Sequence, residues 1–149
     1  MQTSLVFLFH EETRRRHEVS QRKEVFMEFD PLSKEIIGCA IEVHKLLGPV
    51  LLESAYEECL VYELLNKSYQ IDRQKPIPVM YKNIRLDCGY RLDLLVEKRI
   101  IVELKSIDEI TLVHEAQILT YMRFSNIKIG LLINFNVTLL KNGLKRFVL

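Results

Sequence analysis

The stretch RLDLLVEKRIIVELK, from Arg91 to Lys105, places charged side chains inside two otherwise apolar segments. Residues 91–96 and 99–105 have the alternation and branched side chains that are typical of strands. Glu97 and Lys98 lie near the turn between them. Because burying an unpaired carboxylate is costly, the acids inside these strands require an explanation.

If the hairpin pairs Val96 with Ile100, Asp93 lies directly opposite Glu103. The period of two residues along a strand puts Lys105 on the same face as Glu103. Two carboxylates would then face each other at about 5 Å, with an ammonium beside them. Since like charges repel, either one acid is protonated or a cation lies between them, and Mg²⁺ is the usual cation for phosphate chemistry.

A second interpretation of the same residues is a structural acid–lysine pair near the strand ends. The spacing of Asp93, Glu103 and Lys105 is short and tolerant, so by itself it favours neither interpretation.

The remaining periodicities place helices and strands around this hairpin. They predict helices over 33–47, 52–66 and 111–124, and further strands over 77–81, 128–135 and 144–149. Ser33 is expected to cap the first helix, and Gly48-Pro49 to end it. This order predicts an α/β single domain with a central mixed sheet flanked by helices.

Composition narrows the class of protein. A chain of 149 residues fits one domain. Its three cysteines form no CxxC pair, which argues against a zinc ribbon, an iron–sulfur cluster or a disulfide framework. No apolar run reaches the roughly 18 residues of a membrane helix, and no secretory signal pattern opens the chain. We therefore expect a cytoplasmic protein without a membrane segment; homo-oligomerisation is left open.

Charge bears on any nucleic-acid partner. The net charge is +1, and from Met27 onward 16 Lys and Arg side chains balance 16 Asp and Glu side chains. A DNA-binding role therefore requires a local basic rim and bound metal. Residues 1–26 have mixed charge and few apolar anchors, so we expect a flexible extension, with Met27 as an alternative start and 27–149 as the domain.

Several motifs together resemble known families. Asp93, with Glu103-Leu104-Lys105, is similar to the motif of the PD-(D/E)XK nucleases, and Gln117 with Tyr121 resembles the QxxxY signature of their RecB-like branch. Residues 47–58, 114–117 and 132–135 resemble the GxxExxY proteins, and the similarity extends from about residue 31 to residue 149. Val50 stands where that family has glycine. If this position requires a positive φ, the valine strains the turn.

The resemblance implies a restriction-endonuclease-like core with a divalent metal site. Glu53, Asp93 and Glu103 match the metal-binding acids, and the Leu104 carbonyl is a further candidate ligand. The implied cofactor is Mg²⁺ or Mn²⁺. Without the resemblance, the first interpretation of Glu53 is a helix N-terminal acid that the macrodipole favours.

The resemblance also assigns roles to three other side chains. Lys105 matches the lysine that positions the attacking water and offsets charge on the phosphate. Gln117 and Tyr121 lie four residues apart on one helix face and match residues that steady the site or the nucleic-acid backbone. By spacing alone Tyr121 is equally a core residue. Tyr56 is expected to be a core aromatic with a hydrated hydroxyl rather than a catalytic residue.

The implied function is a metal-dependent nuclease that hydrolyses phosphodiester bonds by metal-activated water, without a covalent intermediate. DNA is the expected substrate, and the choice between DNA and RNA is left open. Two alternatives remain at this point. One is a catalytically inactive nucleic-acid-binding module of the same fold. The other is a protein-interaction module that acts as a partner in an assembly.

Overall fold

The computed structural model describes residues 30–149. The predictions made for residues 1–26 lie outside this range. The chain divides into two units, Met1–Glu35 and Ile36–Leu149, with the boundary inside the first helix that the structure describes. The sheet and the site belong to the second unit, and no helix within 30–149 is long and apolar enough to cross a membrane.

The described elements confirm the predicted α/β class. In chain order they are α2 (Pro31–Leu47), α3 (Glu53–Asn66), β1 (Ile71–Tyr81), β2 (Ile84–Val96), β3 (Ile100–Lys105), α4 (Leu112–Ser125), β4 (Ile129–Asn134), the 3-10 helix η1 (Leu140–Gly143) and β5 (Leu144–Val148). The strands form one mixed sheet in the order β1-β2-β3-β4-β5. Neighbouring strands are antiparallel except β3 and β4, which are parallel.

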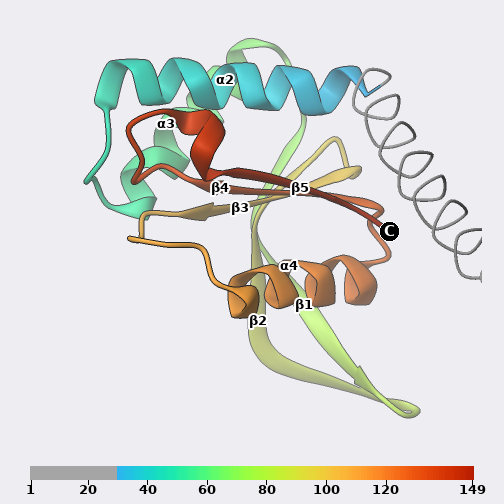
Figure 1. Cartoon of the computed structure of the whole chain (residues 1–149). Coiled ribbons are helices and arrows are strands. Elements are labelled where there is room, and N and C mark those ends of the chain that lie inside the picture. The colour runs from blue at the N-terminus through green and yellow to red at the C-terminus, as the bar shows by residue number, and fades with distance from the viewer. Residues whose placement is uncertain (1–29) are drawn as a thin grey trace, which may run out of the picture. The chain divides into compact units, whose positions relative to one another are not determined.

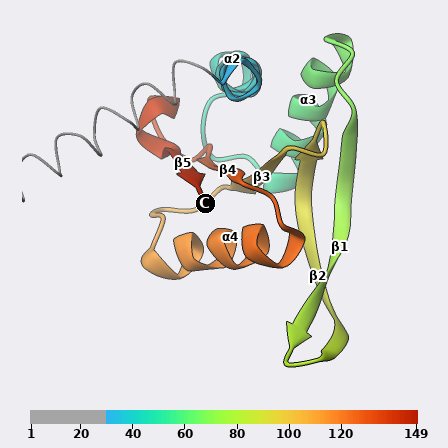
Figure 2. The ribbon, with the colours of Figure 1, turned by 90° about the vertical axis from the view of Figure 1, so that its right-hand side faces the viewer.

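The sheet lies between two helical layers (Figures 1 and 2). From Ile36 onward α2 lies with α3 on one face, and α4 covers the other. Parallel strands need a crossover connection, and α4 provides it between β3 and β4. These central strands are covered on both faces, so they are almost continuously apolar and buried. A charged residue in β3 is therefore exceptional.

Gly130 allows α4 to pack closely on β4. A Cβ at this position would lie 2.7 Å from the Met122 sulfur and 3.1 Å from an Ile118 methyl group. Both side chains are fully buried in the cluster between α4 and the sheet. The absence of a side chain at Gly130 thus determines how near α4 lies to the strands that carry the acids.

The β1–β2 hairpin is longer than the sequence predicted. The predicted strands began at residues 77 and 91, whereas β1 begins at Ile71 and β2 at Ile84. Most residues of the added segments are partly or fully exposed, so they lack the alternating burial on which the prediction relied. Backbone pairing between the two strands forms the hairpin there, and its tip extends beyond the rest of the sheet (Figure 2).

The predicted N-cap of the first helix was wrong. The helix begins at Pro31, and the Ser33 amide and hydroxyl both donate to the Asp30 carboxylate. Asp30 therefore caps the helix, with proline at the first helical position, where its missing N–H costs nothing. Ser33 lies within the first turn.

Val50 occupies a strained conformation in the turn before α3. Its φ is +71°, in a region that a β-branched residue rarely adopts. Its side chain is 80% exposed and gains little from burial. The Val50 amide donates to the Asn136 side-chain oxygen at 3.2 Å, which helps to hold the turn. The positive φ under which a valine at this position was expected to strain the turn is therefore present.

Replacing Val50 with glycine should raise the free energy of unfolding by about 1 kcal/mol, since relief of left-handed strain exceeds the entropy cost of glycine. This corresponds to a rise in Tm of roughly 2–4 °C. Val50→Ala is the matched control, because it keeps the Cβ and should gain much less. A Gly variant no more stable than wild type in thermal unfolding would show that the turn carries no strain.

Candidate active site

The β2–β3 register brings the two predicted acids together. Val96 pairs with Ile100 as expected, and Leu94 pairs with Val102. At the next position of this register, hydrogen bonds from backbone amides to side-chain carboxylates replace the backbone–backbone hydrogen bonds of the sheet. The Asp93 amide donates to the Glu103 carboxylate at 3.1 Å, and the Leu104 amide donates to the Asp93 carboxylate at 2.9 Å. These reciprocal hydrogen bonds fix both carboxylates at the same point between the strands.

Glu103 is the electrostatically unusual member of this pair. Only 5% of the residue is exposed. Burial, followed by the negative charge of Asp93, raises the pKa of Glu103 to about 8. The Asp93 amide and the charge of Lys105 act in the opposite direction without cancelling the rise. At neutral pH and without a cation, Glu103 therefore keeps its proton, which is one of the two expected responses to repulsion.

Lys105 follows Glu103 by two residues on β3 and is partly exposed. Its charge lowers the pKa of Glu103, so the ammonium acts electrostatically on this buried acid. Between residues 30 and 149, no partner forms an ion pair or hydrogen bond with this ammonium. The alternative interpretation, a structural acid–lysine ion pair, is therefore not found in this part of the chain.

Glu53 is not brought into the acid pair. It is the exposed first residue of α3, where an acid suits the helix dipole. Within residues 30–149, no three Asp, Glu, His or Cys side chains lie close enough to hold one metal ion. The expected convergence of Glu53 with Asp93 and Glu103 is absent here. Glu53 lies on α3, a separate helix, and no local sequence pattern specifies where that helix packs relative to β2 and β3.

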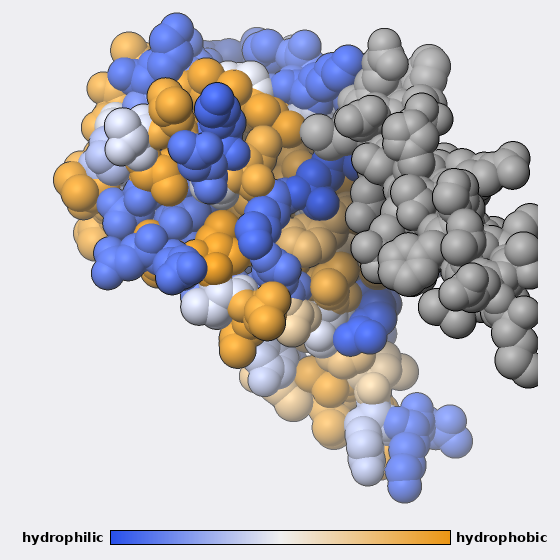
Figure 3. All heavy atoms as spheres, in the orientation of Figure 1, coloured by the Kyte–Doolittle hydropathy of each residue, from blue (hydrophilic) through white to orange (hydrophobic). Residues whose placement is uncertain are grey.

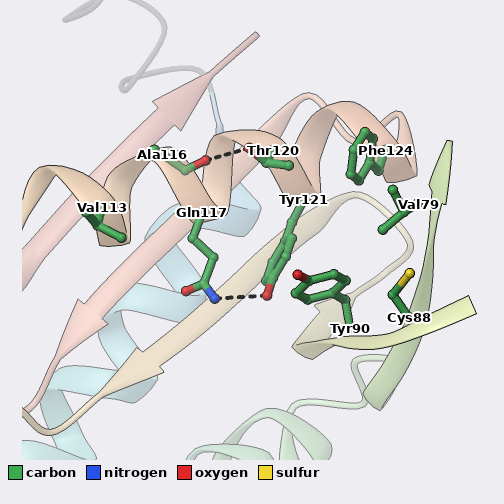
Figure 4. A pocket seen from close by; sticks show the side chains of 9 residues that line it. All are labelled: Val79, Cys88, Tyr90, Val113, Ala116, Gln117, Thr120, Tyr121 and Phe124. Atoms are coloured by element: carbon green, nitrogen blue, oxygen red, sulfur yellow. Dashed lines mark hydrogen bonds between the residues drawn. The ribbon is translucent and has the colours of Figure 1, made fainter. Parts of the chain in front are cut away.

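Helix α4 carries Gln117 and Tyr121 to the neighbourhood of the acids. The Gln117 amide donates to the Tyr121 hydroxyl at 2.9 Å, as Figure 4 shows. Tyr121 packs in the buried cluster with Ile101 of β3. Its pKa is raised, first by burial and then by the charge of Glu103. Tyr121 is thus both a core residue and a neighbour of the acid pair.

Tyr56 is a structural residue, and only part of its role was predicted from the sequence. Its ring is fully buried and stacks on Phe135, with centroids 4.4 Å apart and an interplanar angle of 9°. The expected hydrated hydroxyl is wrong: this hydroxyl donates to the Gly48 carbonyl at 2.5 Å and accepts from the Leu51 amide at 3.2 Å. The Ser106 hydroxyl donates to the Leu51 carbonyl at 2.5 Å, which links this turn to the end of β3.

Asn134 holds the loop that follows Lys105, a role that sequence reasoning missed. Its side-chain oxygen accepts from the Ile107 and Asn136 amides at 3.1 and 3.2 Å, and its nitrogen donates to the Ile107 carbonyl at 2.9 Å. The residue is 2% exposed. A single polar residue ending an apolar strand was the available signal, the same kind that identified Asp93.

Three other polar side chains near the sheet and helices have structural partners: His114, Lys145 and His44. The His114 ring accepts from the Thr111 amide at 2.9 Å, so it caps α4. Lys145 forms an ion pair with Glu115. His44 bonds the Val137 carbonyl at 2.7 Å. None of these side chains contributes to the acid pair.

Comparison with known proteins agrees with this geometry. A family model described as the PD-(D/E)XK nuclease superfamily matches residues 30–147. Searches of curated proteins and of solved structures give no significant match. The matched range contains the whole sheet up to Phe147, both acids and Lys105. Because the match covers most of its length, the chain belongs to the PD-(D/E)XK nuclease superfamily.

Proposed function

We propose that this protein is a metal-dependent nuclease that hydrolyses phosphodiester bonds in DNA at Asp93, Glu103 and Lys105. One observation carries the proposal: Glu103, a buried acid whose pKa is raised to about 8, faces the partly buried Asp93 beside a lysine that has no ion-pair partner among residues 30–149. Such perturbed groups are typical of functional sites. Membership of a nuclease superfamily supports the same chemistry.

The donor set fits a hard divalent cation. Asp93 and Glu103 offer carboxylate oxygens at one point, and we include the Leu104 carbonyl as a further ligand. The family pattern adds Glu53, which would have to move from the start of α3 towards the acid pair to reach the ion. Mg²⁺ is commonly held by only one or two carboxylates, with water and phosphate completing its shell, so the absence of a third close acid is compatible with it. When bound, the ion would acidify a water molecule and offset phosphate charge. Mn²⁺ offers similar chemistry.

The remaining side chains would act on the substrate and the water. Lys105 is assigned to orient the attacking water and to stabilise the negative charge that grows on the phosphate. Gln117 and Tyr121, joined by their hydrogen bond on α4, are assigned to steady the site and the nucleic-acid backbone. Glu53-x-x-Tyr56 and Gln117-x-x-x-Tyr121 support placing the protein with the GxxExxY proteins in the RecB-like branch.

The decisive test is a cleavage assay on supercoiled plasmid, linear duplex and single-stranded DNA, each with Mg²⁺, Mn²⁺ or EDTA. We expect cleavage with either metal and none in EDTA. Asp93→Asn is the matched control. Its amide oxygen can still accept from the Leu104 amide, but it removes an anionic ligand, so activity should fall at least a hundredfold. Metal-independent DNA binding without cleavage would instead indicate a binding module of the same fold.

A further inference from the structure

A hollow of about 540 Å³ lies between α4 and the β1–β2 hairpin, outside the acid pair itself. Figure 4 shows its walls, which include Val79, Cys88 and Tyr90 from the hairpin and Gln117, Tyr121 and Phe124 from α4. The volume falls within the usual range of small-molecule sites. Cys88 and Tyr90 are exposed, so a ligand can reach the hollow from solvent.

A bulge in the hairpin sets the position of its side of the hollow. Ile77 pairs with Tyr90 and Val79 with Leu86, so three residues of β2 stand opposite Pro78 alone. Gly89, one of these three, has a φ of +76°. Bulges bend a strand and redirect its side chains. Here the residues at and after the bulge line the hollow opposite α4.

The hollow shares a wall with the acid pair. Tyr121 lines the hollow, and the charges of Glu103 and Asp93 both act on its hydroxyl. A nucleotide whose phosphate lies at the acids would therefore have this hollow within its immediate surroundings. Continuity with the proposed phosphate site distinguishes the hollow from an isolated apolar depression.

The lining has the chemistry of a nucleobase site. Tyr90 is 48% exposed as a residue, and its ring centroid lies 6.1 Å from that of Tyr121 in a tilted arrangement. Within residues 30–149, Gln117 uses only its amide nitrogen, so its carbonyl oxygen remains able to accept a hydrogen bond. Aromatic faces bind unstacked bases, and an amide can pair with a base edge.

The hairpin also supplies the local positive charge that the chain as a whole lacks. Between residues 76 and 91 it carries Lys82, Arg85 and Arg91 against a single acid, Asp87. Figure 3 shows apolar side chains along this region and hydrophilic ones at its tip. Cations beside an apolar, aromatic-lined hollow are the combination expected for a single nucleic-acid strand, whose backbone and bases both need contacts.

We propose that this hollow receives one unstacked nucleobase of the strand being cleaved, with Tyr90 as its stacking surface. The inference rests on the proposed nuclease function and extends it: the preferred substrate region is single-stranded or locally opened. A paired base inside a duplex is stacked on its neighbours and cannot enter the hollow without unstacking.

The test is a double-mutant cycle on binding affinity, in which one side chain and one base are removed singly and together. Single-stranded oligonucleotides with an abasic site at successive positions are titrated by fluorescence anisotropy in EDTA, where a metal-dependent nuclease cannot turn over. One position should weaken wild-type binding roughly tenfold, the scale of one base–aromatic stack. Tyr90→Ala should lose about as much affinity for the intact strand. It should also become insensitive to the abasic site at that position.

Two variants serve as controls. Tyr90→Phe keeps the ring and should keep the coupling. Tyr81→Ala removes another exposed tyrosine of the same hairpin, one that does not line the hollow, and should leave the coupling unchanged. If the affinity losses caused by Tyr90→Ala and by the abasic site multiply at every position, the side chain and the base act independently. That result would overturn the inference. Cleavage in Mg²⁺ by the same wild-type preparation would then leave the nuclease proposal intact.

A measurement on the wild-type protein covers the case in which Tyr90→Ala fails to fold. Cys88 is exposed in the wall of the hollow, whereas Cys39 is buried. Alkylation of Cys88, followed by mass spectrometry, should slow several-fold when an intact single strand is bound. It should slow much less with the strand that is abasic at the sensitive position. Equal protection by the two strands would count against a base in the hollow.

Discussion

Lys105→Met should lower turnover by roughly a hundredfold or more, the usual scale for losing a preorganised electrostatic group. Methionine preserves much of the aliphatic length, so β3 should still pack. The ammonium removed has no ion-pair partner among residues 30–149, so its loss should leave no buried partner uncompensated. The loss of activity would then report on chemistry rather than on folding. Plasmid cleavage in Mg²⁺ measures it directly.

Metal binding separates the catalytic role of Lys105 from a structural one. Calorimetry with Mn²⁺ above pH 8, where Glu103 is largely ionised, should give equal or tighter binding for the variant, since one neighbouring positive charge is gone. Lys98→Met, at the exposed turn of the same hairpin, should change neither property. Cleavage at the wild-type rate would contradict the catalytic role, and loss of the metal would identify Lys105 as a structural partner of the acids.

Glu103→Gln should make the protein more stable at pH 8 in EDTA. The pKa of Glu103 is about 8 in the folded protein and 4.5 as its unperturbed value. The folded state therefore retains a proton across this window that the unfolded state has released. The stability that protonated Glu103 contributes is complete below pH 4.5 and is lost progressively as the pH rises towards 8. The difference is on the order of 4 kcal/mol.

Glutamine imitates the protonated acid at all pH values, which makes it the matched comparison. Urea unfolding of both proteins in EDTA should give similar stabilities near pH 4.5 and diverging ones as the pH approaches 8. Mg²⁺ at pH 8 should stabilise the wild type, because it binds the folded state, and should stabilise Glu103→Gln much less. Parallel stability curves for the two proteins across this range would show that Glu103 is not held in its protonated form.

The local parts of the site could be predicted from the sequence. The alternation in residues 91–105 and the turn at Glu97-Lys98 specify which strand residues share a face and which stand opposite. Asp93 therefore lies opposite Glu103 as predicted, and Lys105 lies two residues after Glu103 on β3. The four-residue spacing of Gln117 and Tyr121 likewise placed their side chains in contact. These relations depend only on strand and helix periodicity.

Relations between separate elements were not accessible in the same way. The hairpin beyond Arg91 is largely exposed, so hydrophobic alternation could not mark its extent, and backbone pairing alone forms it. Glu53 fits the family pattern yet stands apart from the acids, because its position depends on how α3 packs on the sheet. The partners of Tyr56 and Asn134 are backbone groups of other segments, which carry no signal in the side-chain sequence.

The sequence by itself determined the α/β class, the order of the described elements and the pairing of Asp93 with Glu103, because hydrophobic period and turn position act over a few neighbouring residues. Only the tertiary structure decided that Glu103 is buried enough to hold its proton, that Glu53 stays outside the pair and that a hollow opens beside Tyr121. Burial, distance and cavity shape depend on how α3, α4 and the hairpin pack on the rest of the sheet. That packing joins segments that are distant in the sequence, so no local pattern specifies it.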